Sequence, residues 1–166
     1  MTSSGSIVDA ESFSPKDSLL SGPAGGIVGA VSAGKEAGFD KIITFDMGGT
    51  STDVAIYNGK YEYQFETKVG RANIQSPSLH IETIAAGGGS ICSIKNGLLS
   101  VGPESAGADP GPACYGAGGP LTVTDINLLS GKLIPSEFGI PVSIDQAEKA
   151  LTSLAEELTK QSGRHY

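Results

Sequence analysis

The pattern of apolar and polar residues divides the chain into a polar start, a helix, a run of strands, a glycine- and proline-rich loop and a helical tail. Residues 1–20 lack periodicity and are expected to form a loop or an edge segment. Residues 21–34 predict a helix, because Pro23 suits the first helical position and Gly34 suits the stop. Gly25, Gly29 and Ala33 would share a face with little bulk, open to another backbone or a ligand. The alternative for this stretch is a flexible glycine loop.

Short β-branched and alternating runs predict strands between residues 41 and 101. Residues 41–45 (KIITF) and 54–57 form the first two, and Asn58-Gly59 predicts a type I′ turn into a third strand over 60–68. Its aromatic residues alternate with polar ones, so they are expected to face the core and leave one wet face. Further strands are expected over 79–84 and in a hairpin, 91–95 and 98–101, that turns at Asn96-Gly97.

The last third of the chain is expected to be a loop followed by helices. Four prolines and six glycines leave no room for a helix or central strand in residues 102–120. Thr124-Asp125 would cap a short helix over 126–130, and Ser143 with Gln146 forms a capping box. An apolar stripe follows that box at near-helical spacing: Ile144, Ala147, Leu151, Leu154, Ala155 and Leu158. The order of elements predicts one α/β domain over 1–166, with a core at 21–101 and a helical tail at 121–166.

Charge and composition narrow the possible partners. The net charge is −7 and only 11 Lys and Arg residues are present, which argues against nucleic acid and anionic membranes as partners. The two cysteines and two histidines show no zinc-ligand spacing, and no targeting or membrane-spanning run is visible. A cytoplasmic protein with reduced thiols is expected.

A glycine-rich loop follows the first predicted strand and is the main candidate for chemistry. Asp46 and Asp53 bracket it, and between them stand residues with free backbone angles or hydroxyl groups: Gly48, Gly49, Thr50, Ser51 and Thr52. Adjacent glycines let successive N–H groups converge on phosphate oxygens, while the two carboxylates suit Mg²⁺ or its water shell. The loop is neither a Walker P-loop nor a Rossmann fingerprint, and a hairpin turn without a ligand is the alternative.

Other residues carry weaker hypotheses. Gly87, Gly88 and Gly89 would form either a second backbone cradle or a strand crossing. Cys114 lies in a rigid Gly/Pro loop, but no histidine stands near it in the sequence, which favours a buried structural thiol over a nucleophile. Glu104 and Asp109 would be substrate-facing carboxylates or ordinary exposed acids.

The succession of small-residue helix, strand, phosphate loop and hairpin resembles the second half of the actin-like ATPase fold, which is ribonuclease H-like. In that fold two lobes close on one nucleotide, and each lobe supplies a phosphate loop. Longer stretches, which run along nearly the whole chain, make the resemblance more specific. They are KDSLLSGPAGG at 16–26, residues 45–54, AAGGGS at 85–90, VGPESAGADPGPACY at 101–115 and GGPLTVTD at 118–125. They resemble the hydantoinase A/oxoprolinase family, and its 5-oxoprolinase branch most.

The resemblance implies an ATP- and Mg²⁺-dependent hydrolase that opens a small cyclic amide, foremost 5-oxoproline to glutamate, by phosphorylating the lactam oxygen. Gly48, Gly49 and Thr50 would contact the β- and γ-phosphates, with Asp46 and Asp53 as catalytic or metal-binding residues. The alternatives are an N-methylhydantoinase, an acetone-type carboxylase subunit, or a nucleotide-binding module without catalysis. One phosphate loop alone implies an inactive second-lobe fragment, whose partners would be the first lobe of the same polypeptide and a hydantoinase B-type protein.

Overall fold

The computed structural model describes residues 1–69 and 71–163, which form two compact units. The first unit comprises Met1–Asp46 and Asp53–Ile84; the second comprises Met47–Thr52 and the chain from Ala85 onward. The sequence predicts one domain, whereas each unit gathers its own cluster of buried apolar side chains. No helix in the described part of the chain has the length and apolar character needed to cross a membrane.

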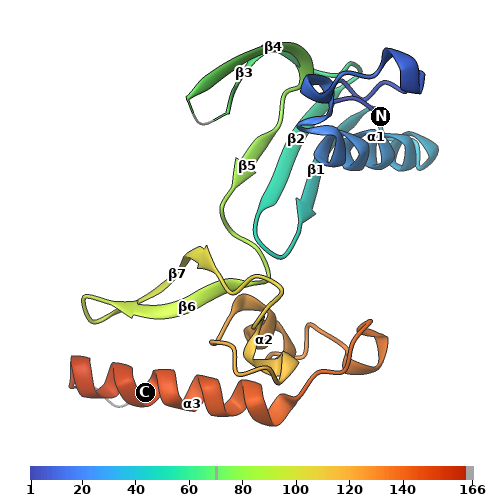
Figure 1. Ribbon diagram of the computed structural model, residues 1–166. Helices are drawn as coiled ribbons and strands as arrows, with labels where there is room; N and C mark the ends of the chain where they lie inside the picture. Colours follow the sequence, from blue (N-terminus) through green and yellow to red (C-terminus); the bar gives the residue numbers. More distant parts are fainter. Residues whose placement is uncertain (70, 164–166) are drawn as a thin grey trace. The chain divides into compact units, whose positions relative to one another are not determined.

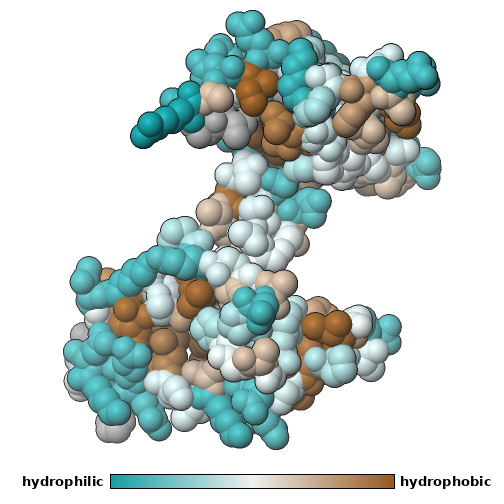
Figure 2. All heavy atoms as spheres, in the orientation of Figure 1, coloured by the Kyte–Doolittle hydropathy of each residue, from teal (hydrophilic) through white to brown (hydrophobic). Residues whose placement is uncertain are grey.

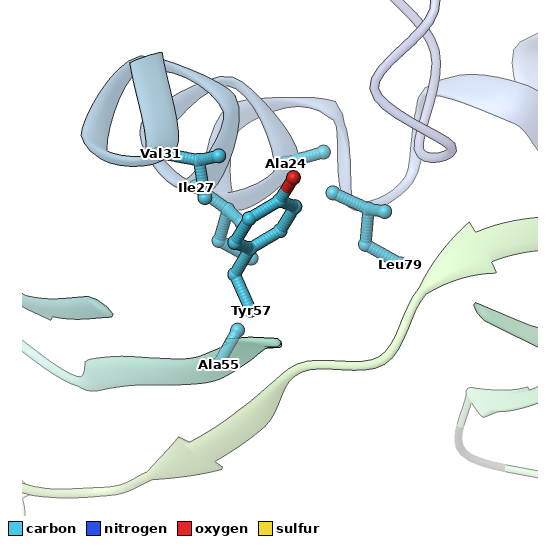
Figure 3. Close-up of a cluster of buried hydrophobic side chains, with 6 residues drawn as sticks. All are labelled: Ala24, Ile27, Val31, Ala55, Tyr57 and Leu79. Atoms are coloured by element: carbon cyan, nitrogen blue, oxygen red, sulfur yellow. The ribbon is translucent and has the colours of Figure 1, made fainter. Parts of the chain in front are cut away.

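A helix packed on a small sheet forms the centre of the first unit. Helix α1 (Ser21–Glu36) lies against strands β1 (Lys41–Met47) and β2 (Thr52–Asn58), and β5 (Glu82–Ile84) completes a sheet of order β1-β2-β5 (Figure 1). Its core joins one face of the helix to one face of β2 and the end of a further strand: Ala24, Ile27, Val31, Ala55, Tyr57 and Leu79 (Figure 3). The Lys35 Nζ lies over the Tyr57 ring, 4.8 Å from its centroid.

Helix α1 confirms the predicted helix but differs at its ends. It begins at Ser21, so Pro23 is its third residue, and it continues past Gly34 to Glu36. Gly34 serves packing instead of termination, because a Cβ there would lie 2.5 Å from Ile42 Cδ1. The predicted small-residue face is open, since Gly29 and Ala33 are exposed and a Cβ at Gly29 would meet nothing within 4 Å.

The third predicted strand forms a separate ribbon; of its aromatic residues, Tyr61 packs against the core as expected, whereas Tyr63 and Phe65 do not. Strand β3 (Tyr63–Val69) pairs antiparallel with β4 (Ala72–Leu79), which the sequence did not predict because Pro77 interrupts its pattern. Phe65 is 71% and Tyr63 48% exposed, because no further element covers this face of the two-stranded sheet. Asn58-Gly59 is not a type I′ turn: Gly59 has a positive φ, but Asn58 does not.

The second unit joins a hairpin to two helices. Strands β6 (Ser90–Lys95) and β7 (Leu98–Ser105) turn at Asn96 and Gly97, whose φ angles of 55° and 74° confirm the predicted hairpin turn. Strand β7 continues to Ser105, past Pro103 and into the stretch predicted as loop. Helix α2 (Val123–Leu129) begins directly after the Thr122 cap, three residues earlier than predicted. Helix α3 (Ile144–Ser162) begins after Ser143, whose hydroxyl accepts a hydrogen bond from the Gln146 N–H as predicted. Short 3₁₀ turns complete the chain at Ala10–Ser12, Pro15–Ser18, Ala113–Tyr115 and Pro135–Glu137.

Candidate functional site

The predicted phosphate loop is the tight turn that joins β1 to β2. The two strands extend through Met47 and from Thr52, which leaves only residues 48–51 outside them. The Gly48 N–H donates to the Ser51 carbonyl oxygen at 2.9 Å and closes this 48–51 turn. The turn is exposed at Gly48, Gly49 and Thr50, so a ligand can reach its backbone.

The glycine segment after β5 supports the 48–51 turn. The Gly88 N–H donates to the Gly48 carbonyl at 2.9 Å, and the Gly89 N–H donates to the Gly49 carbonyl at 2.6 Å. A Cβ on Gly87 would lie 2.7 Å from the carbonyl oxygens of both turn glycines, closer than real Cβ atoms approach backbone. Glycine is therefore required here so that two backbone segments can touch.

The same contacts bear on the two hypotheses for Gly87, Gly88 and Gly89. The Gly87 N–H donates to the Ser90 hydroxyl at 2.9 Å, so all three N–H groups already have acceptors within the protein. The segment is thus a close backbone crossing whose N–H groups are engaged within the protein, and a direct contact with phosphate stays a prediction. Thr52 is also engaged, because its hydroxyl donates to the Ala86 carbonyl at 2.6 Å and is buried.

Three N–H groups of the turn remain available. Within residues 1–69 and 71–163, the N–H groups of Gly49, Thr50 and Ser51 and the hydroxyls of Thr50 and Ser51 have no hydrogen-bond partner. The carbonyls of Gly48 and Gly49 are held by the crossing, which fixes the turn without using these donors. Consecutive unsatisfied N–H groups of a tight turn form an anion-binding concavity.

The two candidate carboxylates belong to the first unit. Asp46 is exposed at the end of β1, and its Oδ2 would lie 3.0 Å from a Cβ at Gly26, so this helical glycine lets the carboxylate approach α1. Asp53 is half-buried, and its Oδ1 accepts a hydrogen bond from the Thr83 hydroxyl at 2.7 Å. Among the described residues no group of three His, Cys, Asp or Glu side chains is arranged to hold a metal ion.

A buried carboxylate organises the Gly/Pro loop of the second unit. Asp125 is fully buried, and its oxygens accept hydrogen bonds from four donors: Ala113 N at 3.2 Å, Cys114 N at 2.7 Å, Thr122 N at 2.7 Å and Thr122 Oγ1 at 2.9 Å. Asp125 therefore takes part in the cap of α2 as predicted, but the cap residue is Thr122, and Thr124 and Asp125 lie in the first turn of the helix. The same carboxylate also holds the 113–115 turn across the loop. Satisfying a buried carboxylate with several N–H groups fixes the loop conformation.

Cys114 has the properties of a structural thiol. It is 1% exposed, and burial, with a hydrogen bond to Asp125, raises the pKa of its thiol from 9.0 to about 12. A nucleophilic cysteine needs a lowered pKa and access to the reactant. The choice of a structural role over a nucleophile is thus supported.

Glu104 and Asp109 do not lie where the hypothesis of substrate-facing carboxylates would place them. Glu104 lies within β7, and its carboxylate pairs with Lys95 of β6 at 3.2 Å on an exposed face of the hairpin. A backbone N–H and the Lys95 ammonium lower the pKa of Glu104. Asp109 is exposed. Neither acid lines the pocket beside the turn.

That pocket has a volume of about 440 Å³ and joins the 48–51 turn to the Gly/Pro loop within the second unit. Its lining consists of Gly49, Thr50, Gly107, Ala108, Tyr115 and Ile140. Sequence analysis missed Tyr115 and Ile140, which stand far from the turn along the chain. The one sequence signal was the length of the Gly/Pro loop, since long ordered loops often carry function.

The fold places the protein in a class of ATPase-type lobes with a mixed α/β architecture, as the sequence predicts. The nucleotide-free structure of an ATP-dependent acetone carboxylase superposes with a TM-score of 0.81 over 99% of this chain and 24% of that one; at 24% identity it shows the fold alone. The ATP-dependent caprolactamase of Pseudomonas jessenii superposes with a TM-score of 0.78 and 36% identity, over 95% of this chain and 24% of that one.

Sequence comparison identifies the family within this class of ATPase-type folds. A model of the hydantoinase/oxoprolinase family matches residues 1–163, and the chain belongs to this family. The 5-oxoprolinase of Saccharomyces cerevisiae is 55% identical over 144 residues, which cover 83% of this chain and 11% of that protein. The chain therefore spans about a tenth of the length of this curated relative.

Proposed function

We propose that residues 1–166 form part of an ATP-dependent hydrolase of small cyclic amides, in which the 48–51 turn binds the transferred phosphate. The observation that carries the proposal is the turn itself: its carbonyls are held by Gly88 and Gly89, while the N–H groups of Gly49, Thr50 and Ser51 have no partner among the described residues. Such donors fit phosphate oxygens, and glycine leaves no Cβ to obstruct their approach. A plain hairpin turn needs no supporting segment of three glycines.

The need for ATP follows from the stability of an amide. Resonance makes the ring carbonyl a poor electrophile, and transfer of the γ-phosphoryl group from ATP to the carbonyl oxygen activates the carbonyl carbon toward water. After water adds, the ring nitrogen takes up a proton and leaves, which breaks the C–N bond and opens the ring to an acyl phosphate. A second water attacks the carbonyl carbon of this acyl phosphate and releases phosphate. Free N–H groups around the phosphoryl oxygens would neutralise charge that develops during this transfer. The similarity to 5-oxoprolinase and to caprolactamase supports a lactam as the acceptor.

Magnesium binding is assigned to the aspartates that flank the turn in the sequence. Asp46 is the stronger candidate for a metal-bound water or direct ligand, because its carboxylate is exposed. Asp53 is better suited to orienting, since the Thr83 hydroxyl already engages one of its oxygens. Mg²⁺ keeps several waters and takes one or two protein carboxylates, so no cluster of three acids is required.

The rest of the site would come from further elements of a longer polypeptide. One face of the β1-β2-β5 sheet packs on α1, whereas the other exposes large apolar side chains: Ile43 at 73%, Phe45 at 70%, Ile56 at 55% and Ile84 at 56%. Apolar side chains also reach the surface elsewhere in both units (Figure 2). Exposed apolar surface of this extent is typical of an interface, and the greater length of the relatives supplies candidates for it.

The test is ATP turnover by the full-length polypeptide that contains these residues, with and without a lactam. We expect ADP release that depends on 5-oxoproline or another small cyclic amide. Lactam-independent turnover, or none, would favour a nucleotide-binding module instead. Bicarbonate-dependent turnover would favour the carboxylase alternative.

A further inference from the structure

We propose that the pocket beside the 48–51 turn holds the ring of the cyclic amide, with Tyr115, Ala108 and Ile140 against its methylene groups. This inference rests on the proposed function and assigns the substrate to residues of this chain. The pocket is lined on one side by Gly49 and Thr50, the residues whose N–H groups would hold the phosphate, and on the other by the Gly/Pro loop.

The position of the pocket favours the phosphoryl acceptor over the nucleoside. An acceptor oxygen must come within van der Waals contact of the phosphorus atom, so the acceptor occupies the space next to the phosphate donors. The adenosine of ATP is separated from the γ-phosphoryl group by two further phosphates and would lie farther from these donors. A pocket that shares Gly49 and Thr50 with the phosphate therefore suits the acceptor.

The lining matches a neutral ring. No charged side chain lines the pocket, and apart from Thr50 and Tyr115 its residues offer only apolar side chains or glycine backbone. Its volume of about 440 Å³ is in the range of small-molecule sites, which are mainly apolar with a few polar groups. Without a lysine or arginine here, the carboxylate that distinguishes 5-oxoproline from a plain lactam must be recognised by residues outside this pocket.

The wall of the pocket that contains Tyr115 is held in place. Asp125 accepts hydrogen bonds from the N–H groups of Ala113 and Cys114, which fixes the 3₁₀ turn that ends at Tyr115. The Tyr115 ring packs on Gly111, where a Cβ would lie 2.7 Å from Cδ2, and its centroid is 6.2 Å from that of Phe138. A rigid aromatic wall can discriminate ring size, because a ring that fits poorly gains no compensating shift of the wall.

The experiment reduces the volume of the pocket by enlarging the exposed lining residue Ile140 and measures the effect on KM. Ile140 is 45% exposed, so Ile140→Trp adds bulk at the pocket without disturbing the core, and Ile134→Trp adds the same bulk at a residue 61% exposed and outside the lining. In the full-length enzyme, KM for ATP and KM for lactams with five-, six- and seven-membered rings are measured by ADP release. We expect Ile140→Trp to raise the lactam KM about tenfold, most for the largest ring, with the ATP KM almost unchanged. Ile134→Trp should change neither.

Each other outcome has a distinct meaning. An Ile140→Trp enzyme with a raised ATP KM and an unchanged lactam KM would assign the pocket to the nucleotide. Unchanged values for both substrates would remove the pocket from the site, while lactam-dependent turnover of the unmodified enzyme would leave the proposed function standing. If the unmodified enzyme shows no lactam-dependent turnover, the proposed function fails, and this inference fails with it.

Discussion

The N–H group of Gly89 donates to the carbonyl oxygen of Gly49 across 2.6 Å, so a segment about 40 residues downstream fixes the 48–51 turn. The turn is consequently shaped before any ligand arrives. Preformed donors cost little reorganisation when charge develops on a transferred group.

The close crossing makes Gly87 sensitive to any side chain. Gly87→Ala would place a Cβ 2.7 Å from the carbonyl oxygens of Gly48 and Gly49 and push the turn away. We expect a loss of about 1–3 kcal/mol in the free energy of unfolding, together with weaker ATP binding by the full-length enzyme. Gly29→Ala is the matched control: its Cβ would meet nothing within 4 Å on the exposed side of α1, and stability should rise by roughly 0.5–1 kcal/mol. Equal effects of the two substitutions in urea unfolding would contradict this explanation.

The hydrogen bonds of Asp125 predict a large effect of an isosteric change. Asp125→Asn would point an NH₂ group toward N–H donors and leave buried groups unsatisfied, at a cost of roughly 3 kcal/mol in the free energy of unfolding. Asp145→Asn, an exposed residue in the first turn of α3, should cost less than about 1 kcal/mol. Thermal and urea unfolding of both variants measure the difference. A loss of less than about 1 kcal/mol in Asp125→Asn would mean that water reaches this carboxylate.

Cys114 links stability to alkaline pH. Its folded pKa of about 12 lies above the ordinary value of 9.0, so folding favours the protonated thiol. The stabilisation is complete below pH 9.0 and is lost as the pH rises toward about 12, because the unfolded chain releases the proton first. We expect the stability of Cys114→Ala to fall less than that of the unmodified protein over this range. The variant should also retain lactam-dependent ADP release; loss of that activity alone, with folding intact, would restore the nucleophile hypothesis.

Asp46 is predicted to matter for catalysis and little for folding. Its carboxylate is exposed, so Asp46→Asn should leave the unfolding free energy within about 0.5 kcal/mol of the unmodified value. In the full-length enzyme we expect lactam-dependent ADP release to fall at least about 100-fold, and excess Mg²⁺ to restore it only in part. Asp9→Asn, another exposed aspartate, serves as control. Intact ADP release in Asp46→Asn would remove this residue from the site.

Local signals predicted the elements that local physics determines. The pair Asn96-Gly97 correctly predicted the turn between β6 and β7. Ser143 with Gln146 correctly predicted the start of α3, and the β-branched run at 41–45 correctly predicted β1. The predicted site residues differ in whether their hydrogen-bond donors are free. The N–H groups of Gly49, Thr50 and Ser51 have no partner among the described residues, whereas the Thr52 hydroxyl and the Gly87 N–H donate to acceptors within the protein. Their roles, like those of Asp46 and Asp53, stay predictions.

The failures came from packing between distant segments. The exposure of Phe65 depends on whether another element covers β3, which no periodicity records. Gly34 reads as a helix stop from the sequence alone, yet its lack of a side chain accommodates Ile42. Tyr115 lines the same pocket as the 48–51 turn because Asp125 holds the neighbouring Cys114 N–H and so fixes the Gly/Pro loop.

The central claim, that the 48–51 turn holds a phosphoryl group on its way to a cyclic-amide oxygen, is tested most directly by isotope transfer. The full-length enzyme is given ATP and a lactam labelled with ¹⁸O at its carbonyl, and the released phosphate is analysed by mass spectrometry. Phosphorylation of the carbonyl oxygen, followed by loss of the ring nitrogen and attack of water at the carbonyl carbon of the acyl phosphate, predicts that each released phosphate carries that ¹⁸O atom. Gly87→Ala should slow the appearance of labelled phosphate in parallel with ADP release. Unlabelled phosphate, released while the ring opens at the normal rate, would contradict the account.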